Sequence, residues 1–370
     1  MNYIECQRCV MDTTAKNIAF NAAGHCNFCE DFLSKEKAIF VDKNVNELIS
    51  RIKLNGKREY NCVVGLSGGV DSAYTLVKVI ELGLRPLVVH MDNGWNSELA
   101  QSNIENLINS LGVDLYTHVI EWDVYRDMMQ ALFAADVVDV EILYDNAMLG
   151  ACYKAAKKFN VKHILSGSNY LTEGMKMPDE WNWYKRDVKN IKGICKKQNV
   201  RNFKSFPFHS SINRVVDELI YGIKWIPFLD YIPYNKEDAL IELEQNYKYR
   251  RYPYKHYESI FTRFYQGYIL PKKFNIDKRR IHLSNLIITN QISRKVAKQL
   301  LNNEPYELED LLEDREYFLK KMGWSEKKLN DYLDREPKSH YSYPNERSSW
   351  ERFKRNVDCI KAKLNKSDIK

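Results

Sequence analysis

The sequence predicts an α/β protein with a doubly wound parallel sheet, preceded by a small cysteine-rich module and followed by a mainly helical region. Short apolar runs alternate with helical patterns between about residues 60 and 175. Strict alternation of this kind is typical of a parallel sheet with helices on both faces. Two cysteine pairs lie near the N-terminus, and tyrosine, with 24 copies, is denser in the second half of the chain.

The composition is that of a soluble globular protein: the 370-residue chain is 44% apolar and 28% charged. Its formal charge of +7 favours anionic partners but does not separate nucleotides from RNA. No apolar run approaches the roughly 18–20 residues that cross a bilayer, and the first residues lack the order of a signal peptide. We therefore expect a cytoplasmic protein with no membrane partner, in which disulfides rarely persist.

The four N-terminal cysteines form two CxxC pairs, Cys6 with Cys9 and Cys26 with Cys29. This spacing is typical of a zinc ribbon, because zinc binds four thiolates in a tetrahedron and a two-residue spacer lets one tight turn supply two of them. We therefore expect structural Zn²⁺. The ligand type alone also permits an iron–sulfur cluster, and unpaired dithiols or a redox pair are weaker alternatives.

The first strand is expected at 62–66, where the run CVVGL is apolar on both faces. A helix follows the next loop and ends at Gly83. Further strands are expected at 86–91, 115–120 and 162–167, with helical segments between them. Ligands of such sheets bind beyond the carboxyl ends of the strands, where three loops would lie: 67–72, 92–94 and 167–169.

The loop after the first strand has the composition of a phosphate-binding loop without the lysine of a Walker A motif. Gly68 and Gly69 let backbone N–H groups approach an anion, Ser67 and Ser72 add hydroxyl donors, and the following helix contributes its positive end. Asp71 is a carboxylate among phosphates, which makes chemical sense if Mg²⁺ bridges them.

The segment SGGVDS between strand and helix closely resembles the signature of the PP-loop ATP pyrophosphatases. The resemblance implies their adenine nucleotide alpha hydrolase-like fold, with ATP and Mg²⁺ as cofactors. It also implies attack on the α-phosphate, release of pyrophosphate and an adenylated intermediate. The nucleotide-binding residues that it implies are Ser67, Gly68, Gly69, Asp71, Ser72, Asp92, Gly167 and Asn169, and Asp71 is also assigned a catalytic role.

One branch of this superfamily thiolates tRNA and also pairs a zinc ribbon with the loop, so it is the main alternative. Its members generally carry a reactive cysteine beside the nucleotide. Downstream of the loop this chain has Cys152, Cys195 and Cys359, none of them in a CxxC pair. Cys152 lies in an apolar helical pattern and is interpreted as a core residue, although it keeps the alternative open. A zinc-ribbon protein that only senses nucleotide is a third, non-enzymatic reading.

The stretch 255–297, together with the cysteine module, resembles the N-acetyl sugar amidotransferase family from the ribbon to about residue 310. The resemblance implies conversion of an acetamido group of a nucleotide-activated or nonulosonic sugar to acetamidino, in surface-polysaccharide or flagellar glycan biosynthesis. An adenylated amide oxygen would leave as AMP when ammonia adds. Which sugar and which acetamido group react is left open.

Ammonia would come from a separate protein, because no glutaminase motif stands out in this chain and position 2 is Asn2 rather than a cysteine. The family suggests a glutaminase subunit and an ammonia-channelling subunit similar to those of histidine biosynthesis. No nucleic-acid partner is expected.

The stretch 255–297 supplies further candidate site residues. A histidine titrates near neutral pH, and basic side chains would neutralise phosphate charge. Solvated helix faces and structural histidines are the plain alternatives. The candidates are catalytic His256, Glu258 and Lys278, and substrate-binding Lys255, Lys273, Arg279 and His282.

The expected parts are a zinc ribbon at 1–35, a connecting helix or linker at 36–58 and a PP-loop core at 59–180. A substrate-binding helical region at 181–310 and a charged helical tail at 311–370 follow.

Two aromatic segments leave alternatives open. In the basic segment 178–204, Trp181 or Trp183 could stack on a sugar nucleotide or on RNA bases, or the segment could be an exposed insertion. The tyrosines between 247 and 257 are expected at an interface with a partner subunit.

Overall fold

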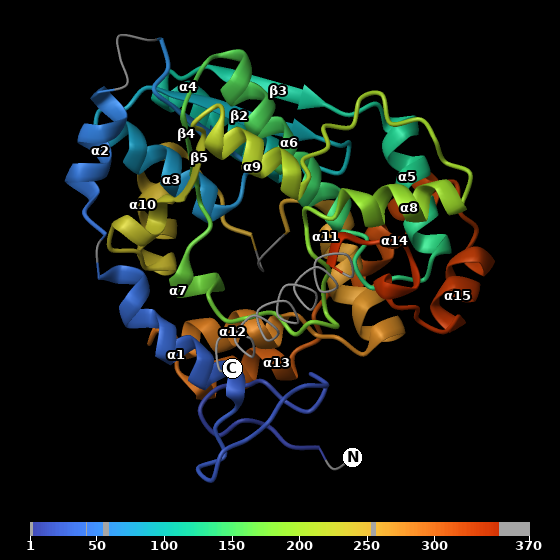
Figure 1. Ribbon diagram of the computed structural model, residues 1–370. Helices are drawn as coiled ribbons and strands as arrows, with labels where there is room; N and C mark the ends of the chain where they lie inside the picture. Colours follow the sequence, from blue (N-terminus) through green and yellow to red (C-terminus); the bar gives the residue numbers. More distant parts are fainter. Residues whose placement is uncertain (1–2, 42, 55–58, 253–256, 348–370) are drawn as a thin grey trace, which may run out of the picture.

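The computed structural model describes residues 3–41, 43–54, 59–252 and 257–347. The described strands form a five-stranded sheet in the order β3-β2-β1-β4-β5, seen in the upper part of Figure 1. All neighbouring strands are parallel, so the doubly wound fold class is confirmed. The strands are β1 (Cys62–Gly65), β2 (Pro86–Asp92), β3 (Leu115–Val119), β4 (His163–Ser166) and β5 (Lys224–Pro227).

The sequence of β1 explains its central position. Val63 packs into one hydrophobic core and Val64 into the core on the opposite face of the sheet. Successive side chains of a strand point to opposite faces, so a wholly apolar strand requires cover on both sides. In register, Val63 pairs with Leu87 of β2 and with Ile164 of β4.

Helices cover both faces of this sheet. The helix expected between the loop and Gly83 begins at Val70 and packs its apolar side on one face. This face is covered by α2 (Val45–Leu54), α3 (Val70–Glu81), α4 (Glu98–Leu111) and α10 (Lys236–Tyr247). The other is covered by α6 (Ile142–Lys158), which contacts β1, β2 and β4, while α8 (Val188–Lys197) packs beside α6 and α5 (Trp122–Ala134) packs beside α8. No described helix has both the length and the apolar character needed to cross a membrane.

The expected strands at 62–66, 86–91, 115–120 and 162–167 correspond to β1 to β4. The fifth strand was not expected, and it lies in the segment assigned to the helical region at 181–310. Its sequence, KWIP, is short and only partly buried at the edge of the sheet, so it carries no continuous apolar run. The sheet therefore extends past residue 180, and α9 (Ser211–Leu219) leads into its last strand.

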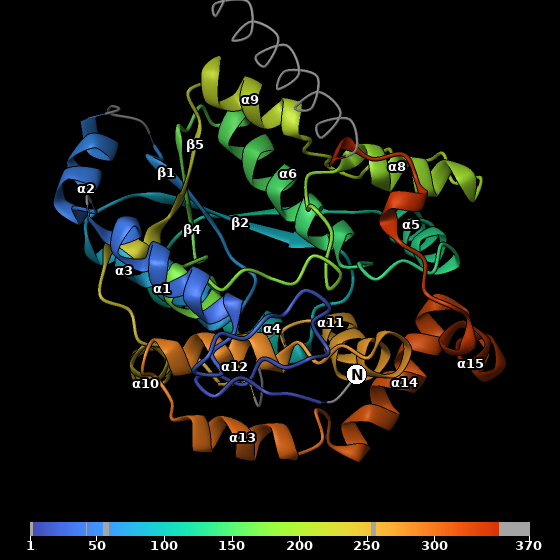
Figure 2. The same ribbon diagram turned by 60° about the horizontal axis from the view of Figure 1, so that its bottom comes forward.

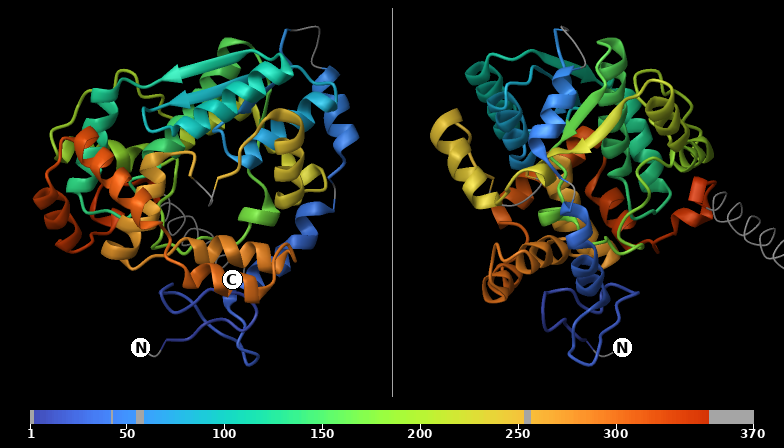
Figure 3. Two further views of the ribbon diagram at one scale, coloured as in Figure 1. Left: turned by 180° about the vertical axis from the view of Figure 1, so that it is seen from behind. Right: turned by 60° about the vertical axis from the view of Figure 1, so that its left-hand side comes forward.

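The N-terminal module lies at the end of the molecule remote from the sheet, beside α12 and α13 (Figure 3). The guanidinium of Arg294 donates to the carbonyls of Cys9 and Cys6 at 2.9 and 2.8 Å, and that of Arg280 donates to Val10. These contacts join the module to the C-terminal half. The arginines belong to α12 (Arg279–Ile288) and α13 (Arg294–Asn302), and within the module α1 (Asn27–Phe40) begins in the second cysteine pair.

The C-terminal region extends the core on the α6 face with a cluster of aromatic rings, in which Phe133 of α5 meets Phe261, Phe318 and Trp324. Its elements are α11 (Ile260–Phe264), the π-helical η2 (Tyr265–Phe274), α14 (Leu308–Met322), α15 (Glu326–Asp334) and the short η3 (His340–Ser342). The described part of the tail expected at 311–370 is thus packed against the body of the protein.

The tryptophans of segment 178–204 are core residues, so neither stacking on a ligand nor an exposed insertion is correct. Trp181 and Trp183 are 1% and 4% exposed. The indole N–H of Trp183 donates to Asp187 at 3.0 Å, and its ring stacks on His340 of the tail. The contact of Trp183 with His340 joins residues more than 100 positions apart, which local composition does not reveal.

Candidate active site

The loop between β1 and α3 forms a cradle at the carboxyl end of the central strand. Gly68 has φ +89°, a conformation that favours glycine, and an added Cβ would lie 3.1 Å from the carbonyl oxygen of Ala100. The Ser72 hydroxyl donates to the carbonyl of Gly69 at 2.9 Å and accepts from the Ser67 N–H at 3.3 Å. Helix α3 starts directly after Gly69, so its first N–H groups and its positive end lie at the loop, as an anion site requires.

Three tyrosines from the C-terminal half contact this loop. The hydroxyls of Tyr249 and Tyr252 both donate to the carbonyl of Gly68, at 2.9 and 3.1 Å. The hydroxyl of Tyr234 donates to Oδ1 of Asp71. Burial, together with neighbouring acidic or phenolic groups, raises the pKa of Tyr234 and of Tyr249, so both remain protonated donors. The partner interface expected for the 247–257 tyrosines is therefore incorrect for Tyr249 and Tyr252.

The loop after β4 closes against the cradle. A Cβ added at Gly167 would lie 2.6 Å from the backbone carbon of Asp71 and 2.7 Å from the amide nitrogen of Ser72. Only glycine permits this backbone approach. Asn169, expected to contact nucleotide, is buried instead, and its side chain accepts from the Thr172 N–H at 2.8 Å. It caps the short helix α7 (Tyr170–Glu173) and does not line the cavity described next.

The cradle opens into a cavity of about 810 Å³. This volume lies within the range of ligand pockets, at its upper end, and its wall combines the loop with residues of the C-terminal half. The lining residues include Ser67, Gly69, Asp71, Ser72, Cys152, Gly167, Tyr249, Tyr252, Glu258, Gln266, Lys278, Arg279 and His282.

Asp92 lies outside this cavity. Its carboxylate accepts from the Gly94 N–H at 2.8 Å, and it lines a separate hollow of about 300 Å³ with His90. The ring Nδ1 of His90 is 2.9 Å from the carbonyl oxygen of Leu66. The end of β2 thus forms its own turn, and Asp92 does not line the same cavity as the phosphate loop.

Glu258 lies directly across from the phosphate loop. A Cβ added at Gly69 would be 3.4 Å from its Oε1. The Glu258 carbonyl accepts from the Ser97 N–H at 2.9 Å, and Ser259 bridges Asn96, so the start of the C-terminal region is attached to the β2–α4 connection. His256 and Lys255, the neighbouring candidates, lie outside the described residues.

The other cavity-lining candidates of this region come from α12 and from Lys278, its N-cap residue. Lys278 is 2.7 Å from Glu141, and both are nearly buried. Arg279 pairs with Asp277 at 2.8 Å. His282 also lines the cavity. Since two of these cations already have acidic partners, this wall offers less uncompensated positive charge than the sequence suggested.

Lys273 is corrected to a structural residue. Its side chain is fully buried away from the cavity, and Nζ donates to the carbonyls of Tyr332 and Arg335 at 2.6 and 2.5 Å. Asp136 lies 3.3 Å away, and desolvation lowers the pKa of the lysine. The sequence pattern around residues 272–274 does not show whether a lysine faces solvent or points into the C-terminal core.

Cys152 lies at the cavity wall, with Sγ 3.2 Å from the position of a Cβ added at Gly65. Burial raises the pKa of its thiol to about 12. The thiol is therefore protonated at neutral pH, which is unfavourable for a nucleophile. Sequence reasoning placed Cys152 in the core but missed that this part of the core borders the site.

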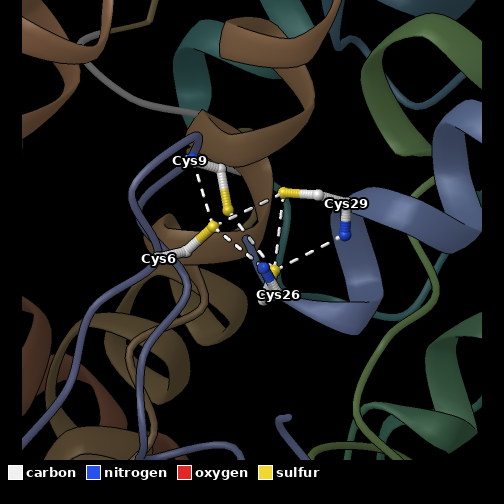
Figure 4. A group of neighbouring side chains, drawn as sticks. All are labelled: Cys6, Cys9, Cys26 and Cys29. Atoms are coloured by element: carbon white, nitrogen blue, oxygen red, sulfur yellow. Dashed lines mark hydrogen bonds between the residues drawn. The ribbon is translucent and has the colours of Figure 1, made fainter. Parts of the chain in front are cut away.

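The four N-terminal cysteines converge on one point (Figure 4). Their sulfur atoms all lie within 4.8 Å of one another, and the side chains are fully buried. Backbone N–H groups of Cys26 and Arg8 donate to Sγ of Cys6 at 3.2 and 3.4 Å. The cluster can hold a metal ion, as the spacing predicted.

Comparison with solved structures finds distant likenesses. NMN synthetase from Francisella tularensis has 14% identity and a TM-score of 0.28, covering 61% of this chain and 97% of that one. The NH3-dependent NAD synthetase from Campylobacter jejuni has 16% identity and a TM-score of 0.27, covering 59% and 94%. The U34-tRNA thiolase NcsA from Methanococcus maripaludis with its [4Fe-4S] cluster has 14% identity and a TM-score of 0.33, covering 84% and 91%.

A comparison with curated proteins gives no match. The family comparison is more informative, because it matches a segment that lines the cavity. Residues 258–356, which include Glu258, Lys278 and His282, match the family model described as LPS biosynthesis protein WbpG-like, C-terminal domain.

Proposed function

We propose that the protein is an ATP-dependent, AMP-forming amidotransferase that converts an acetamido group of a nucleotide-activated or nonulosonic sugar to acetamidino. The observation that carries the proposal is the meeting of two unlike walls in one cavity. The carboxylate of Glu258, at the start of the WbpG-like domain, faces Gly69 of the phosphate loop. ATP and a sugar bound to these two walls would meet between them.

The loop wall would hold the triphosphate. The N–H groups at the start of α3 and the hydroxyls of Ser67 and Ser72 suit phosphate oxygens. Asp71 would hold Mg²⁺, which prefers carboxylate oxygen and neutralises phosphate charge when bound. The Tyr234 hydroxyl orients that carboxylate.

The proposed reaction on the sugar consumes ATP and ammonia and releases pyrophosphate and AMP, and no other reactant is needed. The amide oxygen of the sugar attacks the α-phosphorus, an O–P bond forms and the bond to pyrophosphate breaks. Ammonia adds to the resulting imidate carbon, and the C–O bond breaks to release AMP, so the amide oxygen leaves with AMP. Glu258 would take a proton from the adding ammonia, a role suited to a carboxylate on the acceptor side.

The remaining cavity residues would recognise the acceptor. Arg279 and His282 are proposed to contact the sugar or its nucleotide carrier. Lys278, which the sequence suggested as a catalytic residue, is proposed instead as a positioning residue, because its ammonium is bound to Glu141, which also accepts from Gln266 at 2.9 Å. His256 and Lys255 keep their proposed roles next to Glu258.

The N-terminal cysteines are proposed to hold Zn²⁺ in a structural role. Four ligands at about 2.3 Å from one tetrahedral ion stand about 3.8 Å apart. The sulfur pairs Cys6–Cys29 and Cys9–Cys26 are both 3.8 Å apart, and Cys26–Cys29 is 3.4 Å. In a four-iron cluster each thiolate binds a different iron, which would separate the sulfurs further.

Thiolation of tRNA is the weaker proposal. Cys152 reaches the cavity, but its thiol is held protonated by burial. Among residues 3–41, 43–54, 59–252 and 257–347, Cys152 is the only cysteine that lines the cavity, so the wall offers no second thiol beside it. Ammonia is proposed to come from a glutaminase subunit and a channelling subunit similar to those of histidine biosynthesis.

The test combines ATP, Mg²⁺, an ammonium salt and a panel of N-acetylated nucleotide and nonulosonic sugars, followed by mass spectrometry. Exchange of one oxygen for NH is expected, and a heavy oxygen isotope in the amide should appear in AMP. Release of ADP and phosphate, or label retained by the sugar, would contradict the proposal. Cys152→Ala is the control, because it should leave amidine formation intact while abolishing a thiolation that used this cysteine.

A further inference from the structure

Helix α12 lies between the cavity and the cysteine module, and it presents a different side to each. Its cavity side consists of four residues with the i, i+3, i+4, i+7 spacing of one helix face: Arg279, His282, Leu283 and Leu286. Arg280 and Ser284, which are four residues apart, contact the module instead. Figure 2 shows the N-terminal module lying across α12. The helix therefore connects the cysteine cluster to the wall of the cavity.

The residue that follows the first cysteine pair, Val10, is fixed by the outer side of α12. Its N–H donates to the Ser284 hydroxyl at 3.3 Å, and its carbonyl accepts from the Arg280 guanidinium at 2.9 Å. Val10 and Ser284 are fully buried, and buried backbone groups need partners. Arg280 also lies 3.0 Å from the buried carboxylate of Asp12. Both backbone groups of Val10 thus have their partners on α12.

The same cysteine pair is also held from α13. The guanidinium of Arg294 donates to the carbonyls of both of its cysteines. It lies 2.6 Å from the carboxylate of Glu5, which is 3.5 Å from Arg280 as well. The backbone around the first cysteine pair is therefore attached to α12 and α13 by side chains on both helices.

The second cysteine pair belongs to α1, which is anchored elsewhere. Cys26 is the N-cap of this helix and Cys29 lies in its first turn. Further along α1, the Phe32 carbonyl accepts from the Tyr170 hydroxyl at 2.7 Å, and the two rings stack with centroids 4.5 Å apart. Tyr170 begins α7, directly after the loop that closes against the phosphate cradle. One metal ion bound by both cysteine pairs would therefore join α12 to α1.

We propose that Arg280 and Ser284 are positioning residues, through which the metal-bound cysteine module holds α12, and with it Arg279 and His282, in place at the cavity. Loss of the metal or of the Arg280 contacts should loosen this wall. The phosphate loop should stay intact, because its own hydroxyls and two tyrosines hold it. The inference rests on the proposed function only in treating this wall as the acceptor side.

Hydrogen exchange in the full chain, with Zn²⁺ bound or removed by a chelator, tests the coupling. Removal of zinc should speed exchange of the α12 amides at least about tenfold and leave α3 within about twofold. The helix should loosen rather than unfold, because Asn285 still accepts from the Met175 N–H at 2.8 Å. Arg280→Met keeps all four cysteines, so elemental analysis should still find one zinc per chain. With zinc bound, its α12 amides should nevertheless exchange as fast as those of the zinc-free parent.

Arg335→Met is the matched control. Arg335 also pairs with a buried aspartate, Asp136, at 3.0 Å and donates to a backbone carbonyl, that of Phe133, at 3.2 Å. These partners lie at the end of α5, so exchange of α12 should match that of the parent. Equal acceleration of α12 in both variants, or parent-like exchange in zinc-loaded Arg280→Met, would overturn the proposal.

Ser284→Ala is the second variant, in case Arg280→Met does not fold. It removes one uncharged hydrogen-bond acceptor and should speed exchange of α12 about threefold with zinc bound. Exchange equal to that of the parent would overturn the proposal.

Steady-state kinetics separate this inference from the proposed function. With an acceptor that reacts in the sugar panel, Arg280→Met should raise the KM for the acceptor about tenfold and leave the KM for ATP within about twofold. An equal rise in both KM values would overturn the positioning role. If no sugar reacts, the proposed function fails, and the exchange of α12 still decides the coupling.

Discussion

The two walls of the cavity are built in different ways. The phosphate-loop wall uses backbone N–H groups and hydroxyls from six consecutive residues, 67–72, and its local geometry follows from two glycines and a helix start. The opposite wall uses charged side chains from the C-terminal half, and one of them, Lys278, has its partner Glu141 137 residues away in the sequence. One wall is therefore a local motif, whereas the other exists only after the C-terminal half has folded onto the sheet.

We therefore expect single changes of charge or backbone in the loop wall to impair activity. On the opposite side, we expect some residues to affect catalysis and others to affect only stability. Asp71→Asn should give the largest loss, about 10³-fold in AMP formation, because the amide keeps the Tyr234 hydrogen bond but removes the charge that would hold Mg²⁺. Pyrophosphate release at saturating ATP measures the effect.

Asp92→Asn is the matched control for Asp71→Asn. Asp92 accepts from a turn N–H outside the cavity, so the rate should stay within about twofold of the parent. Equal losses in the two variants, with unchanged melting temperatures, would contradict the assignment of the loop wall.

Glu258→Gln should lower kcat about 10²-fold and leave the KM for ATP unchanged, as expected for loss of a general base.

Lys273→Met should instead lower the stability of the protein and leave catalysis intact, although Lys273 also belongs to the C-terminal half. It leaves the carbonyls of Tyr332 and Arg335 without their donor, at a cost of about 1–3 kcal/mol in the free energy of unfolding, with kcat unaffected. Steady-state kinetics and thermal melting of both variants distinguish chemistry from stability; a catalytic defect in Lys273→Met would refute its structural role.

Gly167→Ala should slow AMP formation by about 10- to 100-fold, because its Cβ would overlap the backbone of Asp71 and displace the loop by a few tenths of an ångström or more. Gly112→Ala offers a comparison without that contact. Gly112 has φ +61° and no atom within 4 Å of an added Cβ, so the change should cost about 1–2 kcal/mol of stability and no activity.

Tyr249→Phe and Tyr252→Phe should each raise the KM for ATP by about threefold or less, and the double variant by about tenfold or more. Each hydrogen bond to the Gly68 carbonyl is worth about 0.5–1.5 kcal/mol, and each hydroxyl compensates for loss of the other. Tyr60→Phe removes a hydroxyl that donates to Asp114 at 2.7 Å and should leave the KM unchanged. Strict additivity of the two changes would show that they act independently of the shared carbonyl.

Cys152 should give the smallest effect. Cys152→Ala should change the rate by less than about twofold, since no step of the amidotransferase reaction uses the thiol. Burial raises its pKa to about 12, so only about 0.1% of the thiol or less is ionised between pH 7 and 9, and alkylation by iodoacetamide should stay far slower than that of a free cysteine throughout that range. A free cysteine, with a pKa of about 8.5, reacts progressively faster over the same interval. Peptide mapping by mass spectrometry measures both.

Local patterns in the sequence determined the sheet core and the metal cluster. Continuous apolar runs specified the central strands β1 and β2, because a strand buried on both faces has no polar side to satisfy. The SGGVDS segment determined the cradle, since glycine conformation and a helix start act within six residues. Two CxxC pairs determined the convergence of four thiolates. Each of these features depends on neighbours in the chain.

Only the tertiary structure decided which charges face the cavity. The sequence offered Lys278 as a catalytic residue and Lys273 and Arg279 as substrate-binding residues. Folding buried Lys273 against α15, whereas Lys278, paired with Glu141, and Arg279, paired with Asp277, both line the cavity. It also turned Tyr249 and Tyr252 onto Gly68. The physical reason is that a side chain's partners in a packed core are set by contacts between distant elements, which no local spacing encodes.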